Sequence, residues 1–324
     1  QVWADWQVAF SQYCYQRYMG LEDEIGVSAG FRQTGTYTLV TEAVAEQEQA
    51  LAETRRQVVA NTDILSAEDM GERLPVVDSS QLAFGVYGEA DGSIDTPTIM
   101  QGWRAAAERL GVTILEGQPA TGIDVIDGRV RAVRTATGVI STRVVVNAAG
   151  ADAAKVGGWA GIDIPIDNRV RNIFIMAHHP LLEGIPAFVQ DAEDTWYFRR
   201  VDEGIMIGMG TRKDAPVQMA PDMDYWPAVR DLVAQRARPL AKLEVIGGWS
   251  GVRPLTPDHR PILGPVDGVE GFINDCGWGG EGIMHAPVGG QLTAEVIAYG
   301  ATRTFDVAPF QLSRFASPVD AQGR

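Results

Sequence analysis

The sequence is poor in cysteine, histidine and positive charge. Its 324 residues include two cysteines and four histidines, and 42 acidic residues outnumber 27 lysines and arginines, which gives a formal net charge of −15. Two cysteines cannot build a disulfide framework or a cysteine-rich metal cluster. A strongly acidic chain without a basic stretch argues against nucleic acid or an anionic membrane as partner. An anionic substrate would therefore need a local cation.

Long apolar runs are also missing. No stretch of 18 apolar residues occurs, so the sequence predicts no membrane-spanning helix. The chain starts at Gln1 and shows no charged-then-apolar leader of a signal peptide. With so few cysteines, we expect a cytoplasmic protein. The 45% hydrophobic and 21% charged residues are typical of a globular protein, long enough here for two domains with their own cores.

Side-chain sets that catalyse reactions unaided are absent from the pattern. His178 and His179 are adjacent and would point to opposite faces of a strand. His259 and His285 have no acidic or cysteine companions at the spacing of metal ligands. No G-x-S-x-G nucleophile elbow occurs. We therefore expect no metal site and no hydrolytic triad, and any redox step would need a cofactor.

What the sequence does contain is a glycine-rich turn within residues 247–300. A short apolar run at 272–275 precedes four glycines, and a helical pattern begins near Ile283. The glycines are Gly277, Gly279, Gly280 and Gly282. Such a turn permits positive φ and lets a ligand approach the backbone, while the helix start presents N–H groups and a positive dipole end. An electron-rich or anionic ligand is predicted; a structural turn without ligand is the alternative.

The turn at 277–282 matches the dinucleotide fingerprint G-x-G-x-x-G in its letters, but we do not expect a Rossmann nucleotide loop. Pro287 lies five residues after the last glycine, and the tail beyond Gly300 shows no second strand. The fingerprint requires a βαβ unit with an acidic residue about 20 residues further on.

Several further motifs accompany the turn in a fixed order. They are G-V-R-P at 251–254, T-P-D at 256–258, R-P-I-L-G at 260–264, Pro309-Phe310 and Arg314-Phe315. With these motifs the sequence closely resembles the amine- and amino-acid-oxidising flavoprotein family of glycine oxidase, D-amino acid oxidase, the sarcosine oxidase beta subunit and dimethylglycine dehydrogenase. Family members open with a strand, a G-x-G-x-x-G turn and a helix that hold the FAD pyrophosphate. We find no such segment here and expect the match to lack it.

The resemblance implies an α/β fold with two domains. The first is an FAD-binding, Rossmann-like domain of the glutathione-reductase type, N-terminally incomplete, and the second is an α+β substrate domain built on an antiparallel sheet. We expect the FAD-binding domain at 1–30, 91–165 and 247–316, and the substrate domain at 31–90 and 166–246.

Local patterns predict the elements that fill these segments. Helices are expected at 3–24, 42–61 and 97–110, and strands at 31–40, 83–87, 112–116, 120–125, 130–134, 142–147, 169–177 and 188–190. A hairpin is expected from 195–199 and 205–210, with Tyr197 on one face and Trp196 and Phe198 on the other.

The resemblance also implies non-covalent FAD and the residues that contact it. In the family the glycine turn abuts the pyrimidine edge of the flavin, and V-V-N-A-A-G, here ending at Gly150, lies beside the adenosine and pyrophosphate. The implied cofactor residues are Ala120, Asn147, Ala148, Ala149, Gly150, Gly277, Gly279, Gly280, Glu281, Gly282, Ile283 and Met284. Spacing alone leaves open an ordinary buried core strand at 143–147. Heterotetrameric sarcosine oxidase tethers FMN through a histidine where Ile94 stands here, so covalent FMN is not expected.

Two residues are predicted to handle the substrate. The resemblance implies that Arg253 holds the substrate carboxylate, since an arginine offers a fixed fork of donors that suits bidentate binding. A salt bridge from Arg253 to Asp258 or another loop acid is the alternative. Tyr197, seven residues before Gly204, matches a cavity-lining tyrosine of glycine oxidase; an ordinary half-buried sheet tyrosine is the alternative.

The function implied is oxidation of the C–N bond of a small amino acid or secondary amine, such as sarcosine, glycine, dimethylglycine or proline, to an imine by hydride transfer to FAD. Oxygen or an electron-transfer partner would reoxidise the flavin, and a hetero- or homo-oligomer is compatible with the family. The alternatives are a non-catalytic FAD-binding subunit or assembly factor of the same fold, or a fragment that is inactive without its N-terminal FAD segment.

Overall fold

The computed structural model describes residues 5–59, 61–185, 187–212 and 218–315. The chain divides into two compact units. Unit 1 comprises Gln1–Val8, Ala29–Asp95 and Val170–Val252, and unit 2 comprises Ala9–Ser28, Thr96–Arg169 and Arg253–Arg324. Each unit is therefore assembled from three separate stretches of sequence.

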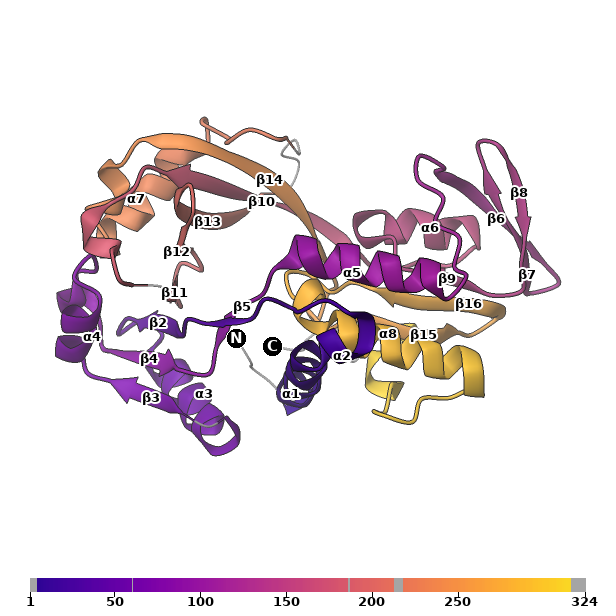
Figure 1. The fold of residues 1–324 in the computed structure, drawn as a ribbon, viewed down its shortest axis with the longest axis horizontal. Coiled ribbons are helices and arrows are strands. Elements are labelled where there is room, and N and C mark those ends of the chain that lie inside the picture. Colours follow the sequence, from indigo (N-terminus) through magenta and orange to yellow (C-terminus); the bar gives the residue numbers. More distant parts are fainter. Residues whose placement is uncertain (1–4, 60, 186, 213–217, 316–324) are drawn as a thin grey trace. The chain divides into compact units, whose positions relative to one another are not determined.

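Unit 1 is built on an eight-stranded sheet (Figure 1). Its strand order is β14 (Val245–Leu255), β10 (Asp167–Met176), β13 (Gly204–Arg212), β12 (Tyr197–Val201), β11 (Phe188–Asp191), β2 (Thr36–Val40), β4 (Phe84–Gly88) and β3 (Thr62–Leu65). Strands β11 and β2 pair in parallel, whereas β10–β13, β11–β12, β12–β13, β2–β4 and β3–β4 are antiparallel. Strands β1 (Arg32–Gln33) and β5 (Gly92–Ser93) form a separate pair, and the helices are α3 (Ala45–Val58), α4 (Ala67–Arg73) and α7 (Trp226–Arg236).

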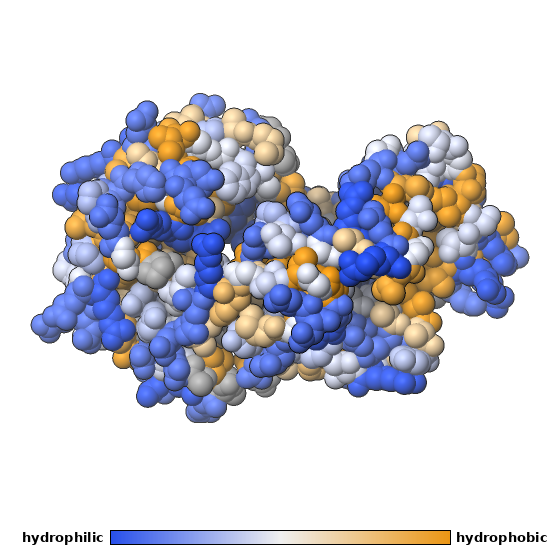
Figure 2. Space-filling view, viewed as in Figure 1, coloured by the Kyte–Doolittle hydropathy of each residue, from blue (hydrophilic) through white to orange (hydrophobic). Residues whose placement is uncertain are grey.

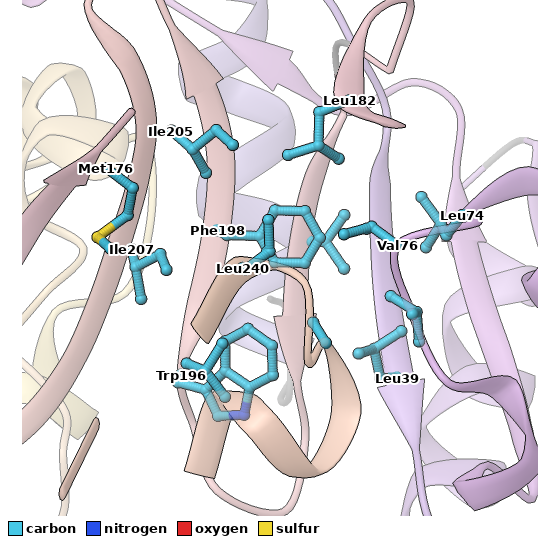
Figure 3. Close-up of a cluster of buried hydrophobic side chains, with 14 of the residues drawn as sticks. Leu39, Leu74, Val76, Met176, Leu182, Trp196, Phe198, Ile205, Ile207 and Leu240 are labelled. Carbon is cyan, nitrogen blue, oxygen red and sulfur yellow. The ribbon is translucent and has the colours of Figure 1, made fainter. Parts of the chain in front are cut away.

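The main core of unit 1 lies on one face of this sheet (Figure 3). Trp196 and Phe198 of the β12 hairpin are fully buried there, whereas Tyr197 between them is half-buried on the other face. The predicted alternation is thus confirmed. Helix α7 contributes Val229 and Val233 to the same cluster, and burying each such apolar side chain stabilises the fold by roughly 1.5–3 kcal/mol.

An ion cluster joins the end of α7 to the end of β11 and includes the buried Asp191 and Arg236. Nη2 of Arg236, at the end of α7, lies 2.8 Å from Oε2 of Glu193, and its Nε lies 3.5 Å from Oδ2 of Asp191. The Thr41 hydroxyl donates to the same Glu193 oxygen at 2.7 Å. Burial raises the pKa of the Asp191 carboxyl. The Asp194 N–H, which donates to Oδ1 of Asp191 at 2.7 Å, and the Arg236 guanidinium both favour the charged carboxylate inside the protein.

Unit 2 is built on a mixed sheet with the order β15 (Ile262–Val266), β16 (Val269–Cys276), β7 (Arg129–Thr135) and β6 (Ala120–Ile126). Two further strands lie off this path: β8 (Gly138–Ser141) pairs with β7, and β9 (Val145–Asn147) pairs with β16. Strands β6, β7 and β8 form an antiparallel meander, in which β6 and β7 are the strands expected near 120–125 and 130–134, whereas β9 and β16 are parallel. The helices are α1 (Asp5–Met19), α2 (Leu21–Ile25), α5 (Thr96–Arg109), α6 (Ala153–Trp159) and α8 (Gly282–Tyr299). Phe272, Ile262 and Ala153 lie at the centre of its core.

Two expectations about strands are wrong. Residues 112–116 form no strand, because the segment begins with the motif that ends α5. The N–H of Val112 donates to the Ala107 carbonyl, and Gly111 adopts a left-handed φ of +87°. The apolar strand at 143–147 is not fully buried, since Val144 and Val146 are exposed. Strand β9 pairs only with β16 among the described residues, which leaves its other edge open.

Hydrophobic side chains are accordingly prominent on the surface of unit 2 over β6–β9 (Figure 2). Several elements were not expected, among them β3, which follows α3, and β8, which lies at 138–141 before the strand expected at 142–147. No helix in the described part of the chain is long and apolar enough to cross a membrane.

The ion cluster gives a stability prediction. Replacing Arg236 with methionine (Arg236→Met) leaves the buried Asp191 with its hydrogen bond from the Asp194 N–H but without its cation, and loss of a buried ion-pair partner costs about 3–5 kcal/mol of unfolding free energy at neutral pH. The pKa of Asp191 is raised in the folded state, so lowering the pH protonates the buried carboxyl and removes its unpaired charge. The loss of unfolding free energy in the variant therefore shrinks as the pH falls toward about 3.9, the pKa of an unfolded aspartate. Urea unfolding at several pH values measures this.

The matched control is Arg230→Met on the same helix. Arg230 forms an exposed ion pair with Asp231 at 2.9 Å, which contributes at most about 1 kcal/mol. Equal losses for the two variants would contradict the role given to Arg236.

Candidate functional site

The glycine turn leaves the sheet of unit 2 at the end of β16. Strand β9 pairs with β16 in parallel, with Val146 opposite Ile273 and Asn147 opposite Asn274. Because the carboxyl ends of parallel strands meet at one edge, residues 148–150 and the turn at 277–282 leave the sheet side by side. The structure thus brings together the two groups of cofactor residues that the sequence analysis placed far apart in the chain.

Asn147 fixes this edge through its own side chain, which is almost fully buried. Its Nδ2 donates to the Ala153 carbonyl at 3.0 Å and to Oδ1 of Asn274 at 3.3 Å, and its Oδ1 accepts from the Ala149 N–H at 3.4 Å. The side chain of this predicted cofactor residue is therefore occupied in joining β9 to β16.

The neighbours of Asn147 are more accessible. Ala148 and Ala149 are exposed, and Gly150 has a left-handed φ of +55° with open space where a side chain would point. Ala120 is exposed at the start of β6, opposite Thr135. Their backbone groups lie at the surface, where a ligand can reach them.

The glycines of the turn make room for the chain itself. Gly277 and Gly279 have left-handed φ values of +73° and +57°. A Cβ atom at Gly277 would lie 2.6 Å from Cγ2 of Thr256, and the Gly279 N–H donates to the Pro254 carbonyl at 3.1 Å. We expected these glycines to let a ligand approach. At Gly277 the space is instead filled by the segment that follows β14.

Arg253 lies directly against this turn. A Cβ atom at Gly280 would fall 2.2 Å from its Nη2 and 2.4 Å from its Cζ, so the guanidinium occupies the space that a side chain at 280 would need. Arg253 is half-buried, and Gly280 is exposed. A cation is thereby held at the start of the helix that follows.

Asp258, considered as an ion-pair partner of Arg253, is bound elsewhere. Arg314 donates to its two carboxylate oxygens at 2.8 Å and 3.0 Å. Burial opposes ionisation of Asp258, but the hydrogen bonds from Arg314 and from the Arg260 N–H outweigh it and hold its pKa below the usual value. The motifs at 256–258 and 314–315 are thus joined by one ion pair, which fixes the loop after β14.

Helix α8 starts at Gly282, and no side chain caps its first turn among the residues that the structure describes. Glu281 is half-buried at the N-cap, Ile283 is exposed, and Met284 is half-buried. Unmet N–H groups and the helix dipole therefore point out of this end. Pro287 lies inside the helix, and the Tyr18 hydroxyl donates to the Ile283 carbonyl.

His285, to which the sequence analysis gave no role, is fully buried beneath this turn. Its Nε2 lies 3.1 Å from Oγ of Ser11 in α1, and its Nδ1 lies 3.5 Å from Oε2 of Glu281. Burial lowers the pKa of the imidazole to about 4, so His285 is neutral at physiological pH. Only the spacing of four residues between Glu281 and His285 could have suggested the contact.

Tyr197 belongs to unit 1, and its surroundings there are those of a packed sheet residue. Its ring stacks on Phe188 at 4.8 Å between centroids, and the Arg171 guanidinium lies 5.2 Å from the ring centre. A Cβ atom at Gly208 on the neighbouring strand would lie 2.1 Å from Cζ of Tyr197. A glycine is therefore needed beneath this ring. The role in substrate binding stays a prediction.

Comparison with known proteins identifies the family. The family model described as DAO, FAD dependent oxidoreductase, matches residues 2–296. The chain belongs to the DAO family of FAD-dependent oxidoreductases. The resemblance inferred from the motifs is thus confirmed.

The curated relatives are longer than this chain. The hydrogen cyanide synthase subunit HcnC of Pseudomonas aeruginosa is 32% identical over 215 residues, which cover 65% of this chain and 50% of HcnC. Mitochondrial dimethylglycine dehydrogenase of Mus musculus is 24% identical over 326 residues, which cover 94% of this chain and 37% of that protein. The chain thus spans half or less of the length of these two relatives.

Solved structures confirm the fold. L-proline dehydrogenase from P. horikoshii has a TM-score of 0.86 at 24% identity, covering 98% of this chain and 85% of that one. Glycine oxidase from Geobacillus kaustophilus has a TM-score of 0.82 at 21% identity, covering 97% and 84%. The predicted α/β fold of FAD-binding type, with its mixed sheets, is therefore confirmed.

The neutral state of His285 can be tested. The pKa of an unfolded histidine is near 6.5, whereas the pKa of folded His285 is about 4. The contribution of neutral, buried His285 to stability is therefore complete above pH 6.5 and is lost as the pH falls toward 4. We expect the unfolding free energy to fall by up to about 1.4 kcal/mol per pH unit in this window because of His285. Urea unfolding of the wild type and of His285→Gln measures this part, which the variant should lack. An identical pH slope in both proteins would show that His285 titrates normally.

Proposed function

We propose that this chain forms the catalytic part of an enzyme that oxidises the C–N bond of a small amino acid or secondary amine to an imine, with FAD as the hydride acceptor. The observation that carries the proposal is the contact between Arg253 and Gly280, which holds a cation against the glycine turn. A guanidinium binds a carboxylate bidentately, and in a chain with a net charge of −15 it gives an anionic substrate a local partner.

The names of the similar proteins support this substrate class. They include dimethylglycine dehydrogenase and sarcosine dehydrogenase among the relatives, and proline dehydrogenase and glycine oxidase among the structures. All four names denote oxidation of an amino acid or an N-methylated amino acid. A carboxylate beside an amine is the feature that these compounds share.

The residues at this edge of unit 2 fit an FAD. The start of α8 carries no side-chain cap in the described chain, and the exposed residues Gly280 and Ile283 are accessible to a planar ring. We propose that the turn and residues 281–284 hold the flavin, and that Ala120 and residues 148–150 hold its adenosine and pyrophosphate. We accordingly assign the FAD-binding role to unit 2 and the substrate-domain role to unit 1.

The residues of the chain have distinct parts in this proposal. FAD, when bound, accepts a hydride from the carbon beside the amine nitrogen. The N–H groups and dipole of α8 favour negative charge on the reduced ring. Arg253 binds the substrate carboxylate and so fixes the orientation of the reacting carbon. Tyr197 is proposed as a substrate contact, and a neutral amine is the form that can lose the hydride.

The role of Arg253 is testable with the purified, FAD-loaded chain. Arg253→Ala should raise the KM for an amino-acid substrate by a factor of about 10² or more, because a charge-assisted bidentate contact is lost. The same variant should also lose much of the preference for an amino acid over the corresponding amine that lacks the carboxylate. Anaerobic bleaching of the flavin by N-methylated and simple amino acids measures both.

The control for this variant is Arg131→Ala, which removes an exposed arginine from β7. Unchanged kinetics for Arg253→Ala would exclude Arg253 as the carboxylate anchor. Bound flavin that no amine bleaches would indicate the alternative, a non-catalytic FAD-binding subunit. Reoxidation of the bleached flavin by air distinguishes oxygen from an electron-transfer partner as acceptor.

Gly280 gives a second test of the same geometry. The backbone at Gly280 does not have a left-handed φ, so alanine causes no backbone strain, but its Cβ must displace the Arg253 guanidinium. Gly280→Ala should therefore raise KM in the same direction as Arg253→Ala, by roughly tenfold, because the flexible side chain can partly readjust. Gly290→Ala, in α8 with nothing near the added Cβ, is the matched control. A wild-type KM for Gly280→Ala would contradict the placement of Arg253.

A further inference from the structure

Helix α8 contains a defect close to its start. Pro287 has no N–H group, so the carbonyl four residues earlier, on Ile283, cannot receive the helical hydrogen bond that residue 287 would otherwise donate. The proline ring also pushes this carbonyl away from the helix axis. Ile283 lies in the first turn of α8, immediately after the glycine turn. The Ile283 carbonyl, which Pro287 cannot bond, is therefore part of the segment proposed to hold the flavin.

Tyr18 supplies the missing donor. Its hydroxyl, at the end of α1, donates to the Ile283 carbonyl across 265 residues of sequence. The side chain is 6% exposed, and burial raises the pKa of its hydroxyl above the usual value, so the group remains a donor over the whole working pH range. A side chain from another helix thus replaces one backbone hydrogen bond of α8.

Other contacts fix α1 in register with α8. Ser11 lies 3.1 Å from the buried His285, and Nη1 of Arg17 donates to Oε1 of Gln291 at 3.3 Å. Arg17 is itself held by Glu24 at 2.5 Å. These contacts lie on the first and third turns of α8, so they hold the Tyr18 hydroxyl in one position relative to that helix.

We propose that Tyr18 is a positioning residue for the first turn of α8 and, through that turn, for the flavin. The inference rests on the proposed function in one respect: that residues 281–284 contact the flavin. Without the hydroxyl, the Ile283 carbonyl must turn toward water, which moves the N–H groups at the start of the helix. These groups are the ones that face negative charge on the reduced ring. Tyr18 touches neither substrate nor cofactor in this proposal.

The test is a double-mutant cycle with Tyr18→Phe and Pro287→Ala. Tyr18→Phe alone should weaken FAD binding roughly fivefold, as expected for one lost hydrogen bond, and should shift the visible flavin spectrum and the reduction potential. Pro287→Ala restores an N–H that can bond the Ile283 carbonyl. In that background Tyr18→Phe should change FAD affinity less than about twofold, since the hydroxyl is then redundant.

Tyr299→Phe is the matched control, because Tyr299 lies at the far end of α8 with an exposed ring, and it should leave all these readouts unchanged. Amide hydrogen exchange of residues 281–288 provides a readout without flavin: Tyr18→Phe should accelerate it, and Pro287→Ala should reverse the acceleration.

The inference is overturned if Tyr18→Phe lowers thermal stability but leaves the flavin spectrum, potential and affinity as in the wild type, or if the two substitutions act additively. None of these measurements uses a substrate. A chain that binds FAD but oxidises no amine would therefore contradict the proposed function and leave this inference standing.

Discussion

The close packing of residues 253–256 on the glycine turn is the constraint on which the rest of the site depends. Thr256 fills the space beside Gly277, the Pro254 carbonyl accepts from Gly279, and the Arg253 guanidinium lies against Gly280. Any side chain at Gly277 or Gly280 would collide with this segment. The ion pair between Asp258 and Arg314 then holds the loop that follows. The contact of residues 253–256 with the glycine turn thus places the Arg253 guanidinium, the turn and the start of α8 next to one another.

Local patterns in the sequence predicted those parts of the fold in which burial alternates or recurs regularly. The β12 hairpin has its tryptophan and phenylalanine inside, as two-residue periodicity predicts, and α5 occupies the expected segment. The pattern failed at Val112, where a helix-ending motif overrides the β-branched residues that follow. It failed again at Val144 and Val146, because an apolar run does not reveal whether neighbouring strands cover it.

The candidate site was predicted in its composition but not in its contacts. The motifs pointed to the glycine turn and to Arg253, but not to the contacts that Thr256 and Arg253 make with the glycines. Tyr18 and Ser11 were not identified at all. Pro287 predicts that the Ile283 carbonyl lacks its backbone donor. The local pattern does not show which residue supplies another donor, because Tyr18 lies 265 residues away in the sequence. Such long-range pairs follow from how helices pack, which no single segment encodes.

The amide pair between Asn147 and Asn274 has a consequence for how the length of the chain can vary. It couples the ends of β9 and β16, so one residue added to either strand would displace the segments after both of them together. Insertions are therefore tolerated poorly at this edge. The exposed turn between β7 and β8, at Ala136 and Thr137, lies outside this pair of strands and is the better place for an epitope or a reporter peptide.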